Sequence, residues 1–149
     1  MKLFQIEEPD GSPVDAASGP GAAVGIDIAP GGIGRIAIAV GGNGEILPDA
    51  DGGRMLRASG LAELLLGLRG RAEKQLARPV THAVIAAAAT ERSGLEAAAA
   101  SAGLTVLRIV DRGAAAALAK GVAAEEAPAL GAAIAAEEAM PAQPVTGRE

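Results

Sequence analysis

Residues 23–40, AVGIDIAPGGIGRIAIAV, decide the fold of this chain. Apolar side chains alternate with small or polar ones over residues 23–28, and the alternation resumes over residues 35–40. Such alternation is typical of half-buried strands, and the glycines between the two runs favour a tight turn. The stretch therefore predicts a β-hairpin. Its one carboxylate, Asp27, lies at the end of the first strand, directly before the turn, and is the first candidate functional residue.

The glycine turn at residues 29–34 has the wrong neighbours for the common nucleotide-binding motifs. A dinucleotide-binding fingerprint needs a helix after its glycines, whereas a strand follows here. A P-loop ends in Gly-Lys-Ser/Thr, which this turn lacks. Two interpretations of the turn remain: its N–H groups bind a phosphate, or its glycines only supply turn dihedrals. Asp27 likewise either holds Mg²⁺ through water or accepts hydrogen bonds from loop amides.

The rest of the sequence predicts an α/β domain with a mixed sheet and flanking helices. The expected strands after the hairpin are residues 45–47, 54–57, 80–87 and 104–110. The expected helices are 61–77 with Ser59 as its cap, a second from Thr90 or Ser93 to Gly103, and then 113–120 and 125–139. The order β-β-β-α-β-α-β-α-α, a meander before crossover units, is typical of a mixed sheet. The expected organisation is a flexible segment at 1–21, one domain at 22–140 and a loose tail at 141–149.

Composition excludes several classes of protein. The 149 residues include no cysteine, which rules out disulfides, thiolate metal sites and a cysteine nucleophile. The formal charge of -5 argues against nucleic-acid binding, which needs a basic face. Phe4 is the single aromatic residue, so the core must consist of Leu, Ile, Val and Ala. Since neither a signal peptide nor a membrane-spanning run is recognisable, we expect a cytoplasmic protein without a membrane partner.

Few other side chains are candidates for chemistry. His82, the single histidine, has no second histidine or cysteine with which to share a metal, and we expect it at a surface or edge. Arg112 is expected at a solvated helix start. The Glu pairs at 125–126 and 137–138 are expected on solvated helix faces. The loop at 48–53 holds two aspartates, Asp49 and Asp51, which suit turn chemistry.

Five segments spread over most of the chain share one family resemblance. They are VGIDIAPGG (24–32), PDADGGRML (48–56), PVTHAVIAAAA (79–89), SAGLTVLRIVDRGAAAALAKG (101–121) and APALGAAIAAE (127–137). In this order they resemble the seventy-kilodalton heat-shock chaperones of the DnaK type, whose first phosphate motif reads VGIDLGTTNS. LFQIEEPDGSP (3–13) is similar to the opening of HscA, the branch that serves iron–sulfur cluster assembly. The resemblance implies a ribonuclease-H/actin-like ATPase half-domain, and ATP or ADP with Mg²⁺ as its ligand.

The resemblance also implies that large parts of the family's ATPase domain are missing. The outer subdomain of its first lobe would lie between Ala58 and Leu61. Its second lobe, with the second phosphate loop DLGGGT, would lie between Gly121 and Glu125. The family's peptide-binding domain, which follows the closing helix, has no counterpart in this sequence.

Positions that carry the family's chemistry are altered within the matching segments. Gly25 and Asp27 match the motif, but the phosphate-contacting hydroxyls of GTTNS are lost at 29–33, and Pro30 has no N–H to donate. Arg112 replaces the glutamate that helps to position catalytic water. No catalytic residue is therefore expected, and Asp27 should act mainly as an acceptor in the turn. The vestigial phosphate loop consists of Gly25, Asp27, Gly31 and Gly32, with Asp27 also at the family's metal position.

Two classes of function follow from the resemblance. One is a degenerate, non-catalytic remnant of a DnaK/HscA-type ATPase domain that binds a protein partner. The other is an ATP-binding chaperone relative, completed by a partner chain, that assists protein folding or iron–sulfur cluster assembly. A ribonuclease-H-type nuclease would need an acidic cluster around two metals, and Asp27 has only Asp111 as a companion. Residues 114–118 and 130–134, which would pack on a second lobe, either pack on each other or form an apolar patch that favours self-association.

Overall fold

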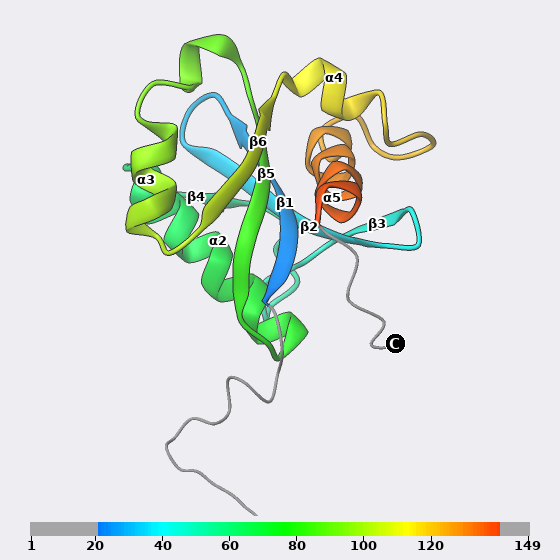
Figure 1. Cartoon of the computed structure of the whole chain (residues 1–149), viewed down its shortest axis with the longest axis horizontal. Helices are drawn as coiled ribbons and strands as arrows, with labels where there is room; N and C mark the ends of the chain where they lie inside the picture. The colour runs from blue at the N-terminus through cyan, green and yellow to red at the C-terminus, as the bar shows by residue number, and fades with distance from the viewer. Residues whose placement is uncertain (1–20, 141–149) are drawn as a thin grey trace, which may run out of the picture.

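The computed structural model describes residues 21–140 (Figure 1). The strands are β1 (Ala22–Ala29), β2 (Ile33–Val40), β3 (Asn43–Ile46), β4 (Leu56–Arg57), β5 (Val80–Ala87) and β6 (Thr105–Val110). The helices are α2 (Leu61–Leu76), α3 (Leu95–Ser101), α4 (Arg112–Ala116) and α5 (Ala127–Ala139), with a 3-10 turn, η1, at Ala89–Glu91. The expectations for the N-terminal segment up to residue 20 and for the tail at 141–149 lie outside the described residues.

The strands form one mixed sheet in the order β3-β2-β1-β5-β6. β4 pairs with the first two residues of β2, whereas β3 pairs with its last four. β1 is antiparallel to β2 and parallel to β5, which is in turn parallel to β6. The β2–β3 turn is a two-residue one, in which Gly41 and Gly42 both have positive φ, as this hairpin type requires. The predicted mixed sheet with flanking helices is confirmed.

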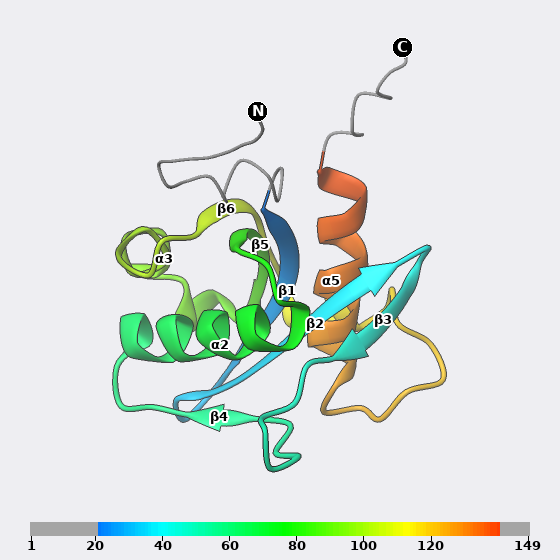
Figure 2. The same cartoon turned by 90° about the horizontal axis from the view of Figure 1, so that it is seen from below.

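Helices cover both faces of the sheet, as Figure 2 shows: α2 and α3 lie on one side of β1 and β5, and α5 lies on the other. The first face is filled by branched aliphatic side chains, among them Ile26 of β1 and Leu65 of α2. The second face is filled mainly by alanines, because α5 is rich in Ala and Gly and is buried along most of its length. Alanine buries little area, so this side of the core is thin.

Two glycines allow α5 to lie directly against its neighbours. A Cβ on Gly25 of β1 would overlap the backbone of Ala133, and a Cβ on Gly131 would overlap the carbonyl of Ala115 in α4. The predicted apolar segments 114–118 and 130–134 therefore pack on each other, as the first alternative had it, while Leu118 stays 49% exposed, as the second had it.

The predicted helix starts were wrong in detail. Gly60, not Ser59, is the N-cap of α2, and the Ser59 hydroxyl instead hydrogen-bonds the Glu63 carboxylate at 3.2 Å. The second helix begins after Gly94, whose φ of 75° makes the turn that separates it from η1. Neither Thr90 nor Ser93 caps α3. The N-cap position has a left-handed backbone conformation, which glycine adopts without strain, and Gly94 occupies it.

Candidate functional site

Asp27 is the one buried polar side chain among residues 21–140, with an exposed fraction of 0%. It lies near the carboxyl end of β1 and points to the face covered by α4 and α5, because its neighbours Ile26 and Ile28 belong to the core on the other face. A charge without water in such a position needs a partner of opposite sign.

The partner of Asp27 is Arg112, the first residue of α4. Its Nε donates to Oδ1 of Asp27 at 2.7 Å, and its Nη2 donates to Oδ2 at 2.9 Å. Both carboxylate oxygens are thus engaged in a bidentate ion pair, a strong and directional arrangement. The hydrogen bonds to Asp27 raise the pKa of the Arg112 guanidinium above its ordinary value, although partial burial opposes the rise.

The pair forms because parallel strands end at the same edge of the sheet. Asp27 of β1 pairs with Ala86 of β5, which pairs with Val110 of β6, so the three residues form one row. Arg112 comes two residues after Val110 in the chain. Asp111 fixes the start of α4, since its carboxylate accepts from the N–H groups of residues 113 and 114 at 2.9 and 3.2 Å.

Two expectations from the sequence are therefore corrected. Asp27 was expected to accept hydrogen bonds from loop amides, whereas the bonds that it makes come from the Arg112 guanidinium. Arg112 was expected at a solvated helix start, but only 29% of its side chain is exposed. The physical reason is the same for both: a buried carboxylate gains more from a cation than from neutral turn amides.

The glycine turn lies beside this pair without sharing its hydrogen bonds. Gly31 and Gly32 have φ values of 86° and 75°, which favour glycine. The Gly32 carbonyl accepts from the Ala58 N–H at 3.0 Å, and a Cβ on Gly32 would overlap the Ala58 carbonyl. Gly32 is thus explained by its contact with the segment after β4, and Gly31 by its dihedral alone. Pro30 contributes no N–H, so the turn has one donor fewer to offer an anion.

Comparison with protein families identifies the relatives of this fold. Residues 24–137 match the family model described as Hsp70 protein, and this span is more than half of the chain. The chain belongs to the Hsp70 family. It is therefore a relative of chaperone ATPase domains, and its mixed sheet with flanking helices is consistent with the actin-like half-domain of that family. A search of curated proteins finds no match to the chain. No helix within residues 21–140 is long and apolar enough to cross a membrane.

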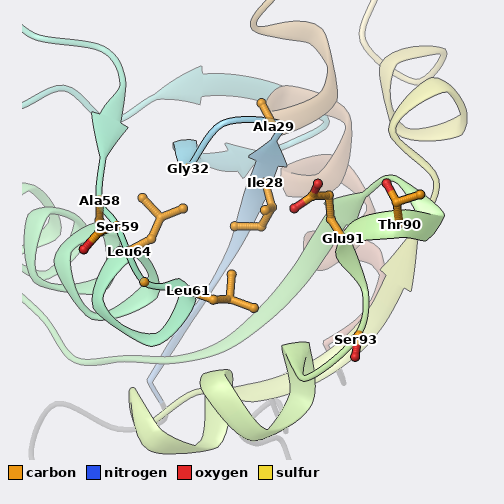
Figure 3. A pocket seen from close by; sticks show the side chains of 11 residues that line it. Ile28, Ala29, Gly32, Ala58, Ser59, Leu61, Leu64, Thr90, Glu91 and Ser93 are labelled. Carbon is orange, nitrogen blue, oxygen red and sulfur yellow. The ribbon is translucent and has the colours of Figure 1, made fainter.

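A cavity of about 250 Å³ opens next to the turn of this Hsp70 relative, at the carboxyl ends of β1 and β5. Figure 3 shows its walls: Ile28 and Ala29 of β1, the start of α2 at Leu61, and the residues of η1. Ile28 follows Asp27 in the strand, so the cavity and the ion pair lie on opposite faces of β1. No lysine or arginine is among the described residues that line it, and the Glu91 carboxylate points toward Ile28. This chemistry does not suit a phosphate.

The remaining candidate residues have structural partners. His82 was expected at a surface or edge; it is half-buried in β5, which lies between β1 and β6, and its Nδ1 is 2.7 Å from the Thr81 hydroxyl. Asp49 and Asp51 accept from nearby loop N–H groups, as predicted. Among residues 21–140, no three His, Cys, Asp or Glu side chains gather where they could hold a metal ion.

The prediction of solvated Glu pairs is confirmed for Glu125, Glu137 and Glu138, which are exposed, and is wrong for Glu126, which is half-buried. Glu126 receives two hydrogen bonds from Arg54, at 2.6 and 3.0 Å, and only 16% of its side chain is exposed. The bond from Arg54 lowers the pKa of Glu126 below its usual value. Glu137 accepts from the N–H groups of Gly41 and Gly42 at 2.7 and 2.9 Å. Both carboxylates thus connect α5 or the residue before it to distant loops.

Proposed function

We propose that this chain is a non-catalytic member of the Hsp70 family, a half-domain in which Arg112 occupies the carboxylate that a metal-bound nucleotide would need. The observation that carries the proposal is the bidentate pair between Arg112 and Asp27. A guanidinium held on both oxygens neutralises the carboxylate and occupies one accepting position on each oxygen. Phosphoryl transfer depends on several groups that position and stabilise charge together, and here the first of them is already engaged.

The glycine turn and the cavity beside it do not fit the phosphates of ATP or ADP. The turn has lost one donor at Pro30, and a described cavity beside it is lined by apolar groups, hydroxyls and the Glu91 carboxylate. A polyphosphate would require cations or a ring of N–H donors at this place.

The connections between elements support a reduced domain. Residues 58–60 join β4 directly to α2, and residues 117–126 join α4 to α5. In the resemblance described above, these are the places of the first lobe's outer subdomain and of the entire second lobe. A cleft between two lobes cannot form from one lobe alone, which is a second argument for proposing a non-catalytic chain.

Within the family, we assign the chain to the HscA-like branch, on the likeness of residues 3–13 to the opening of HscA. A role beside an iron–sulfur assembly chaperone in the cytoplasm follows as part of this proposal. Co-purification of the tagged protein from a soluble cell fraction tests it. Recovery of an HscA-type chaperone or its cluster scaffold is the expected result, and recovery of general folding chaperones alone would contradict the branch assignment.

An assay of phosphate release tests the absence of catalysis. With ATP and Mg²⁺, the protein should release phosphate no faster than the Asp27→Ala variant, because the carboxylate is already bound to Arg112. Turnover that the parent protein shows and Asp27→Ala lacks would contradict the proposal. That result would favour the second candidate, an ATP-binding chaperone relative whose site is completed by another chain.

A further inference from the structure

The side of the molecule formed by β6, α4 and the α4–α5 connection exposes apolar side chains. Leu118 and Val122 are 49% and 42% exposed, although both are large hydrophobic residues. Half-buried Val110 and Ile134 and exposed Ala114 surround them. We call these five residues the Leu118 face. In Figure 1 it lies where α4 and the connection after it pass beside α5.

Hollows lie on two sides of Leu118. One, of about 300 Å³, is bounded by Val110 and Ala114 together with alanines of α4 and α5. The other, of about 170 Å³, lies between Leu118, Ile134 and the β2–β3 turn. Leu118 therefore stands as a projecting side chain between two depressions.

Two opposite charges border the larger hollow. Arg108 of β6 and Glu138 of α5 both line it. Within residues 21–140, neither side chain forms an ion pair or a hydrogen bond, whereas Arg54, Arg69, Arg71 and Arg112 all have carboxylate partners there. The face thus presents an apolar projection, a matching hollow, and one unpaired charge of each sign beside it.

We propose that the Leu118 face binds a second copy of this chain across a two-fold axis. In such an interface both copies use the same patch. If residue i of one copy contacts residue j of the other, then residue j of the first copy also contacts residue i of the second. Leu118 of each copy would enter the larger hollow of the other, and Arg108 of each would meet Glu138 of the other. A patch that carries both a projection and a hollow, and both charges, is complementary to itself.

Pairing of the β6 edges is a less suitable way to form the dimer. β6 has one open edge, but its register with β5 shifts between Ala83 and Val84, so that Leu107 is passed over as a bulge. Bulges twist an edge strand away from regular pairing and protect against strand addition. Contact through side chains of the Leu118 face is therefore the mode that the fold supports.

Sedimentation equilibrium tests the proposal. The parent protein should dimerise below about 100 µM, and Leu118→Asp should weaken dimerisation at least about tenfold, because it places a charge in an apolar hollow. Leu66→Asp is the matched control, since Leu66 is 55% exposed on the outer side of α2 and should leave the dimer unchanged. Far-ultraviolet circular dichroism checks that both variants fold.

A charge exchange separates this interface from unspecific association. Arg108→Glu and Glu138→Arg should each weaken the dimer about tenfold, since each sets like charges against one another. The double variant should recover an affinity within about threefold of the parent's. A strictly monomeric parent protein, equal effects of Leu118→Asp and Leu66→Asp, or additive charge variants would each overturn the proposal. None of these results depends on whether the chain binds a nucleotide.

Discussion

Removal of the Arg112 guanidinium should be among the most damaging single changes in this protein. Arg112→Met keeps an unbranched side chain but removes the guanidinium and leaves the Asp27 carboxylate, 0% exposed, without its countercharge. Breaking a buried ion pair by removing one partner costs about 3–5 kcal/mol of unfolding free energy. Because 29% of the Arg112 side chain reaches solvent, we expect the lower end, about 3 kcal/mol.

The loss corresponds to a fall in Tm of roughly 10 °C for a domain of this size. Urea unfolding followed by circular dichroism measures it, because the chain has no Trp or Tyr for fluorescence. Asp27→Asn should cost less, about 1–2 kcal/mol, since the partly exposed guanidinium can still be hydrated. Arg57→Met, at an exposed arginine of β4, is the matched control and should stay within about 0.5 kcal/mol of the parent.

The variant that carries both Asp27→Asn and Arg112→Met completes a double-mutant cycle. We expect a coupling free energy of at least about 1.5 kcal/mol, because the second change removes a partner that the first has already isolated. Additive effects, or an Arg112→Met variant as stable as Arg57→Met, would refute the reasoning that the pair neutralises a buried charge.

Two further predictions concern α5. Gly131→Ala should lower the free energy of unfolding in urea by about 3 kcal/mol, because the added Cβ would overlap the Ala115 carbonyl. Gly70→Ala is the control in α2: the space around it is open, and the change should raise the free energy of unfolding by about 0.5–1 kcal/mol. Equal effects of the two changes would contradict the close packing of α5. Glu126→Gln should lower stability at pH 7 by about 0.5 kcal/mol, since Arg54 is 54% exposed. Because folding lowers the pKa of Glu126 below 4.5, the stability that the ion pair contributes is present above that pH and is lost as the pH falls. The free energies of unfolding of Glu126→Gln and of the parent should therefore converge by about pH 3, and a difference that stays constant with pH would contradict this prediction.

Elements with a local cause could be predicted from the sequence. The hairpin of β1 and β2 follows from period-two alternation around glycines, and α2 follows from leucines at helical spacing that the structure buries. The caps of α2 and α3 were missed because glycines, rather than hydroxyl side chains, start both helices. The pattern of hydrophobic residues does not indicate which backbone dihedrals the residue before a helix adopts.

The chemistry of the site depends on contacts between distant residues, and these could not be predicted from local patterns. Arg112 and Asp27 are 85 residues apart, and Glu126 and Arg54 are 72 apart. One signal could have indicated the first pair. In the resemblance drawn from the sequence, Arg112 stands where the chaperones have a glutamate, and a cation at that place is a suitable partner for a buried aspartate. The predicted absence of catalytic residues remains a prediction.

Calorimetric titration of the protein with ATP and ADP, each with Mg²⁺, tests the central claim most directly. The account predicts no heat of binding up to about 1 mM nucleotide, because Arg112 already holds both oxygens of Asp27. Micromolar affinity that disappears in Asp27→Ala would show that the carboxylate still serves a bound nucleotide, and would contradict the account.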